Sequence, residues 1–146
     1  EFNIGFDPEA AHIVFSNWPK FDLVDWEATV RHGLDYAEFA RWLQADSPRA
    51  RFYDAISRRT CDWARQQGRA RLFSADALAM AVALEPDIVS EARECHVGIE
   101  LDGALTRGAT VVDWEGRLQQ PANARIILGV DQARFEARIK AALAAA

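Results

Sequence analysis

Residues 94–101 read Glu-Cys-His-Val-Gly-Ile-Glu-Leu, and their alternation decides how the chain is expected to fold. A period of two is typical of a strand that has one face on a core and the other face in solvent. The apolar phase of this strand consists of Cys95, Val97, Ile99 and Leu101. We therefore predict a half-buried strand here.

The segments that follow extend the predicted sheet. A turn signal at residues 102–103 and an apolar run at residues 109–114 together predict an antiparallel hairpin. Residues 125–130 predict a third strand, and Asp131 is placed to cap a last helix. The apolar positions of that helix are Phe135, Ile139 and Leu143.

The part of the chain before these strands predicts mainly helices. Asp7 and Pro8 are typical of a helix start, and this helix is expected to run to about Asn17. A short strand is predicted at residues 21–24, and Asp35 is placed to cap a second helix. Helices first and clustered strands afterwards make the class α/β or α+β.

Two further helices are predicted in the middle of the chain. A long one opens at Ser47-Pro48 and ends at Gly68, and another opens at Ser74 and covers residues 75–84. The apolar stripe expected to be buried on the long helix consists of Phe52, Ile56 and Trp63. Without repeats or a linker-like stretch, the chain is expected to be one domain or one part of a larger domain.

Composition excludes several classes of protein. The chain has 146 residues and a net charge of −5, whereas a nucleic-acid surface needs clustered excess Lys and Arg. It has no run approaching the roughly 20 apolar residues of a membrane span, and the cytoplasm is the default expectation for its location. Cys61 and Cys95 are expected to be buried free thiols.

Several segments in the same order resemble motifs of the inosine-uridine-preferring nucleoside hydrolases. They are residues 1–11 (EFNIGFDPEAA), 76–79 (DALA), 103–113 (GALTRGATVVD) and the Pro-Ala-Asn, Val-Asp and Phe positions between 121 and 135. The resemblance implies an α/β fold: the C-terminal part of an open Rossmann-like nucleoside hydrolase fold, with helices plus a peripheral antiparallel hairpin. It covers only the second half of the family's domain, so residues 1–146 are expected to form that C-terminal half without the N-terminal half.

The resemblance also implies a set of site residues. Glu1 and Asn3 match positions that hydrogen-bond ribose hydroxyls, Phe2 is expected near the sugar, and Asp76 matches a calcium ligand that also touches the ribose diol. Ca²⁺ would hold the diol and the attacking water and lower the pKa of that water. From the residues alone, Asp76 has an ordinary explanation as a helix-start carboxylate.

The remaining calcium ligands and the general base of the family belong to a D-x-D-x-x-x-D-D motif that this sequence does not contain. The catalytic residues within this chain are therefore unknown, and the isolated 146 residues are expected to be inactive.

Ala75 departs from the family's common pattern, which has His at this position to protonate the leaving base. Alanine cannot transfer a proton, so another group has to activate the base. Trp63 is one candidate, through stacking, and its alternative interpretation is a core residue. Glu27 and His32 are possible replacements for the acid. His12 and His96 are expected on exposed faces, and Arg107 is expected to be structural.

The preferred interpretation is calcium-dependent hydrolysis of ribonucleosides to ribose and free base by the full-length protein, in purine or pyrimidine salvage. The alternatives are a catalytically impaired homologue that binds nucleosides or ribosides, and a half that serves as scaffold. The implied partners are a nucleoside, the N-terminal half of the same protein and further copies in a dimer or tetramer, with no nucleic acid and no membrane.

Overall fold

The computed structural model describes residues 1–145, which form two compact units. Unit 1 comprises residues 1–26 and 91–128, and unit 2 comprises residues 27–90 together with the chain from residue 129 onward. The points where the chain passes from one unit to the other carry no linker-like composition, so the sequence did not predict this division.

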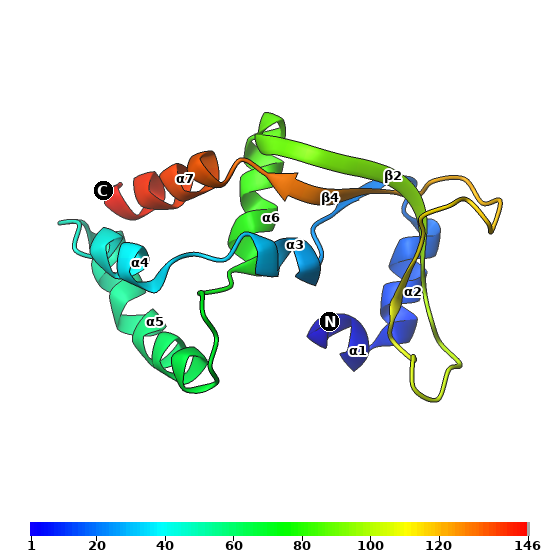
Figure 1. Cartoon of the computed structure of the whole chain (residues 1–146), viewed down its shortest axis with the longest axis horizontal. Helices are drawn as coiled ribbons and strands as arrows, with labels where there is room; N and C mark the ends of the chain where they lie inside the picture. Colours follow the sequence, from blue (N-terminus) through cyan, green and yellow to red (C-terminus); the bar gives the residue numbers. More distant parts are fainter. Residues whose placement is uncertain (146) are drawn as a thin grey trace. The chain divides into compact units, whose positions relative to one another are not determined.

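Unit 1 begins with two helices, α1 (Phe2–Phe6) and α2 (Pro8–Asn17). The sheet contains β1 (Phe21–Leu23), β2 (Val89–Ile99), β3 (Thr110–Asp113) and β4 (Ala124–Val130), in the order β1-β4-β2-β3. The pair β2–β3 is antiparallel and β1–β4 is parallel, and Figure 1 shows β2 and β4 side by side. The hairpin and the third strand are confirmed, although Leu101 lies outside β2.

The core of unit 1 follows from the alternation along its strands. Its centre consists of Cys95, Val97, Ala124 and Ile126. Partly buried side chains, among them Phe15 of α2 and Phe21 of β1, pack against this centre. The prediction of buried free thiols is confirmed, because Cys61 and Cys95 are both free and buried.

Asn123, immediately before β4, joins three segments of unit 1. Its amide nitrogen donates to the carbonyls of Phe15 and Val97, at 2.9 Å each. Its amide oxygen accepts from the Val97 N–H at 2.8 Å. These bonds satisfy backbone groups of α2 and β2 that would otherwise be left without a partner.

Replacing this amide is expected to destabilise the protein. Asn123→Ala strands a part-buried N–H and two carbonyls, which should lower the free energy of unfolding by about 2–4 kcal/mol. Urea unfolding followed by circular dichroism measures the change. Gln120→Ala, at an exposed neighbouring position, is the control. A loss under about 0.5 kcal/mol for Asn123→Ala would contradict this role.

Unit 2 is built mostly from helices. They are α3 (Trp26–Arg31), α4 (Tyr36–Trp42), α5 (Pro48–Gln66), α6 (Ala75–Leu84), the 3₁₀ turn η1 (Pro86–Ile88) and α7 (Gln132–Ala144). Helix α5 packs against α4 and α7, and α6 packs against α7. The predicted caps Asp35, Ser47 and Asp131 each accept backbone N–H groups, so these helix starts are confirmed. Helices α1 and α3 were not predicted.

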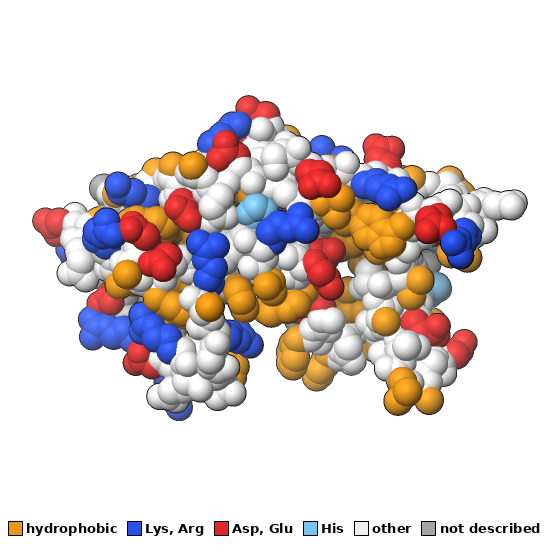
Figure 2. Space-filling view, viewed as in Figure 1, with side chains coloured by type: hydrophobic (Ala, Val, Ile, Leu, Met, Phe, Trp, Pro, Cys, Tyr) orange, Lys and Arg blue, Asp and Glu red, His pale blue; other side chains and the backbone are white. Residues whose placement is uncertain are grey.

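The predicted buried stripe of α5 is wrong. Phe52, Ile56 and Trp63 are 59%, 53% and 50% exposed. The buried residues of α5 are the small side chains Ala50, Cys61 and Ala64. Small residues let α4 and α7 approach α5 closely, which leaves the large apolar side chains on the open face. Exposed apolar side chains are visible at several places in Figure 2.

Glu85, at the end of α6, anchors α7. The Arg138 Nε donates to its carboxylate at 2.6 Å, and the Arg134 guanidinium contacts the same carboxylate. These hydrogen bonds hold the pKa of Glu85 below its usual value, and the bond from Arg138 has the larger effect of the two. A lowered folded-state pKa gives stability that is present above the unfolded pKa and is lost as pH falls through the folded pKa.

Glu85→Gln should therefore lower stability most at neutral pH. The difference in unfolding free energy between the unaltered protein and this variant should shrink as the pH falls from roughly 7 to roughly 3, because the carboxylate of the unaltered protein becomes protonated. Urea unfolding at several pH values measures it. A difference that stays constant over this range would contradict the contribution of these ion pairs.

Candidate functional site

The first turn of the chain brings Glu1 and Asn3 together. Glu1 caps α1, and its carboxylate accepts from the Asn3 N–H at 2.9 Å and from the Ile4 N–H at 3.3 Å. The Asn3 side-chain amide donates to the other Glu1 oxygen at 3.0 Å. Both side chains are exposed. A carboxylate beside an amide can accept from and donate to vicinal hydroxyls, which is the chemistry that a sugar diol requires.

Apolar surface lies on the same helix. Phe2 and Phe6 are 79% and 83% exposed, and their ring centres are 6.3 Å apart. The structure therefore places Phe2 on α1 beside the polar pair, with its ring open to solvent.

Arg107 holds the hairpin loop of unit 1 against the start of α2. Its guanidinium donates to the Leu101 carbonyl at 2.6 Å and to the Glu9 carboxylate at 2.5 Å. Next to it, Gly108 has a φ of +82°, and a Cβ there would lie 3.2 Å from the Gly5 Cα. This close approach and backbone conformation explain the Arg-Gly pair. The prediction of a structural Arg107 is confirmed.

Asp76 lies in the first turn of α6 and is exposed, as is Ala75 before it. Ser74 stands at the N-cap without a side-chain cap hydrogen bond. Among residues 1–145, no group of three or more His, Cys, Asp or Glu side chains could hold a metal ion. Since calcium takes about six to eight oxygens and one carboxylate supplies at most two, Asp76 does not form a calcium site by itself.

Trp63 is not a core residue. It projects from α5 with half of its surface exposed, and the Arg69 guanidinium carbon lies 5.0 Å from its ring centre. The same carbon lies 5.7 Å from the ring centre of Phe73. The sequence did not predict that Arg69 lies beside these two rings, because Trp63 and Phe73 belong to separate segments.

Both ring nitrogens of His32 contact hydrogen-bonding groups of unit 2. Its Nδ1 lies 2.8 Å from the Gln132 Oε1, and its Nε2 accepts from the Val130 N–H at 3.1 Å. This pattern requires a neutral imidazole with its proton on Nδ1. His32 is buried and positions the start of α7, so it is not available as the missing acid. Glu27 is exposed in the first turn of α3.

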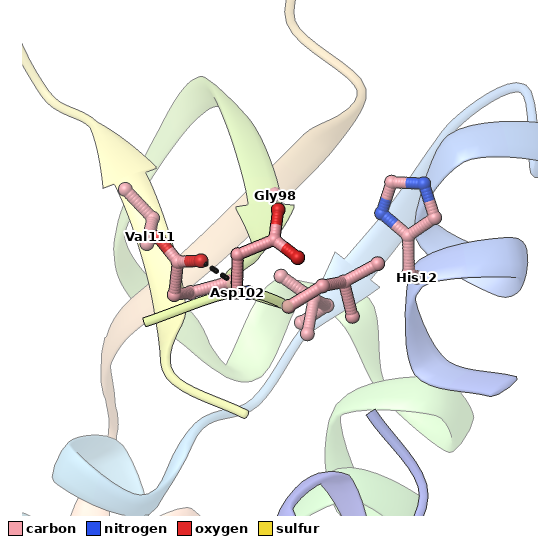
Figure 3. Close-up of a pocket in the computed structure, with 7 residues that line it drawn as sticks. His12, Gly98, Asp102 and Val111 are labelled. Atoms are coloured by element: carbon pink, nitrogen blue, oxygen red, sulfur yellow. Dashed lines mark hydrogen bonds between the residues drawn. The ribbon is translucent and has the colours of Figure 1, made fainter. Parts of the chain in front are cut away.

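His12 is half-buried rather than exposed, which corrects its prediction. It lines a shallow hollow of about 360 Å³ in unit 1 together with residues of β2, β3 and the hairpin loop. Figure 3 shows the His12 ring on α2 and, on the hairpin, Gly98, Asp102 and Val111. The His12 Nδ1 is buried without a hydrogen-bond partner among residues 1–145. His96 contacts the Pro121 carbonyl at 3.2 Å. None of the predicted substrate-binding residues lines this hollow.

The chain is similar in sequence to known nucleoside hydrolases. A model of the family described as inosine-uridine preferring nucleoside hydrolase matches residues 1–137. The non-specific ribonucleoside hydrolase RihC of Klebsiella pneumoniae is 33% identical over 136 residues, which are 93% of this chain and 43% of that protein. The protein of the same name from Salmonella schwarzengrund is 34% identical over 90% of this chain and 41% of its own length.

Solved structures give the same result for the fold. An inosine-guanosine nucleoside hydrolase superposes with a TM-score of 0.86 at 29% identity, over 96% of this chain and 44% of that one. A purine-preferring ribonucleoside hydrolase from Gardnerella vaginalis superposes with a TM-score of 0.83 at 24% identity, over 100% and 48%, a likeness that shows the fold alone. The predicted α/β fold class is confirmed. The chain spans less than half the length of each of these relatives.

Within residues 1–145, no helix combines the length and the apolar character that crossing a bilayer requires. Nothing in these residues tests a cytoplasmic location, which stays a prediction.

Proposed function

Because the chain belongs to the inosine-uridine preferring nucleoside hydrolase family, we propose that it forms the C-terminal half of a nucleoside hydrolase domain. The longer protein would hydrolyse the N-glycosidic bond of ribonucleosides and release ribose and free base, in purine or pyrimidine salvage. The observation that carries this proposal is the family match over residues 1–137, which includes all the segments with candidate site residues.

In this proposal the chain supplies the ribose-binding groups. Glu1 and Asn3 would hydrogen-bond the ribose hydroxyls, and Phe2 would pack near the sugar. Their pairing at the start of α1 supports the assignment, because the Glu1 carboxylate holds the Asn3 amide in a fixed place. If the complete site buries these groups against the sugar, they would reject a substrate that lacks the matching hydroxyls, because they would then be left without a hydrogen-bond partner.

Asp76 would be the chain's calcium ligand. A carboxylate is a suitable ligand for a hard cation such as Ca²⁺. Asp76 is exposed, so it could share a bound cation with carboxylates that lie outside this chain. The other carboxylates and the general base would come from the N-terminal half, and the complete protein would assemble as a dimer or tetramer. Bound Ca²⁺ would supply the acidity that makes a water nucleophilic near neutral pH.

The test of this function compares inosine with 2′-deoxyinosine in a ribose-release assay on the longer protein. We expect kcat/KM for the deoxynucleoside to be at least about 100-fold lower. Asn3→Ala should reduce the ratio of kcat/KM for inosine to kcat/KM for 2′-deoxyinosine. Asn17→Ala, at the end of α2, should leave this ratio unchanged. Equal turnover of both nucleosides, or a ratio that Asn3→Ala does not alter, would contradict the assignment of ribose contacts.

A second candidate function is binding of ribosides without turnover, and Ala75 is the observation that favours it. A protein of this kind would bind inosine in calorimetry and release no ribose. A protein that serves only as scaffold would do neither.

A further inference from the structure

Helix α6 is apolar on every side. Its ten residues contain one polar side chain, Asp76 in the first turn. Leu78, Ala81 and Val82 are buried in unit 2, where α6 packs against η1 and α7. A helix that is hydrophobic all round is typical of a protein interior, because no side of it is suited to water. The composition of α6 therefore predicts that the side away from η1 and α7 is covered as well.

That side is nevertheless open to solvent. It consists of Ala79, Met80, Ala83 and Leu84, which we call the outer face of α6. These residues are spaced three and four positions apart, so they lie on one side of the helix. Met80 is 57% exposed, Leu84 is 63% exposed, and both alanines are exposed. The outer face thus lacks the stabilisation that burial of apolar side chains gives, and its two alanines leave room for another element to approach closely.

The length of the solved relatives indicates what covers this face. This chain superposes over 96% and 100% of its own length but accounts for only 44% and 48% of the two relatives. More than half of each relative therefore lies outside the matched part and has to pack against some surface of it. A lipid surface fits less well, because ten residues are too few to span a bilayer and α6 has no Lys or Arg for anionic headgroups.

We propose that the outer face of α6 is the surface on which the N-terminal half of the longer protein packs. The inference rests on the proposed function and adds the place at which the two halves meet. Asp76 lies four residues before Met80 and seven before Ala83, on the same side of the helix. The packing surface therefore borders the Asp76 carboxylate, and the contact that buries Met80 also brings groups of the N-terminal half near Asp76.

Cysteine labelling measures whether this face is covered. Ala83→Cys places a thiol on the outer face, whereas the native Cys61 and Cys95 are buried. In this chain alone, the added thiol should react with a maleimide as an exposed thiol does. In the longer protein it should react at least about 10-fold more slowly, after correction for labelling of the unaltered protein. Ala137→Cys, at an exposed position of α7, is the matched control and should react equally fast in both.

Met80→Lys gives an independent measurement, because a lysine is costly only where the face is buried. The Tm of this chain should change by less than about 2 °C, whereas the Tm of the longer protein should fall by at least about 4 °C. Ala137→Lys is the control, and it should change neither Tm by more than about 2 °C.

The other results have distinct meanings. Fast labelling of Ala83→Cys in the longer protein, or equal changes of Tm for Met80→Lys in the two proteins, would overturn the inference. Slow labelling in this chain alone that becomes faster on dilution would mean that a second copy covers the face, which also overturns it. Neither measurement depends on catalysis, so a longer protein that releases no ribose from inosine would contradict the proposed activity without deciding where the two halves pack.

Discussion

Residues 1–146 on their own should release no ribose from inosine or from p-nitrophenyl riboside, with or without added calcium. Among residues 1–145, no three acidic, histidine or cysteine side chains are grouped to hold a metal, and Asp76 offers a single carboxylate. Without a bound cation, the attacking water keeps a pKa near that of bulk water, and the rate enhancement that depends on a lower pKa is lost.

This prediction is measured with the purified chain at high concentration and a long incubation. Circular dichroism and thermal unfolding establish in the same sample that the helices and the sheet are present. Robust, chelator-sensitive turnover by this chain would mean that it holds a complete site, and the proposed division of the site between two halves would then be wrong.

Asp76→Asn should abolish activity of the longer protein on both substrates. The amide keeps the size of the side chain and removes its charge, so on the proposed function calcium and the ribose diol would each lose a contact. We expect kcat/KM to fall by at least about 100-fold for inosine and for p-nitrophenyl riboside alike.

Two controls accompany that variant. Asp62→Asn removes an exposed carboxylate of α5 that pairs with Arg65, and it should keep full activity. Calcium titration followed by calorimetry should show weaker binding for Asp76→Asn alone. Undiminished calcium affinity and turnover in Asp76→Asn would remove Asp76 from the site.

Local chemistry explains why most of the elements could be predicted from the sequence. Asp7, Asp35, Ser47 and Asp131 each accept a nearby backbone N–H, so these helix starts depend on only a few neighbouring residues. The alternation around Val97 likewise depends on a single strand. The helix α1 was missed because its cap, Glu1, is not a preferred capping residue.

Features that depend on distant segments could not be predicted. The exposed face of α5 follows from the small residues that meet α4 and α7, and a helical period does not say which face is covered. Asn123 bonds to residues far away in the sequence. Among the candidate site residues, Glu1, Asn3 and Asp76 were identified from motifs, whereas the contact of Trp63 with the Arg69 guanidinium joins separate segments and could not be predicted.

The central claim is that this chain contributes one half of a calcium-dependent nucleoside hydrolase site, and ribose release from inosine by the longer protein tests it most directly. The assay is run with calcium, after chelation, and after calcium is restored. The account predicts turnover that chelation abolishes and calcium restores. Turnover that persists in chelator would contradict the calcium site, and no turnover under any of the three conditions would contradict the enzyme itself.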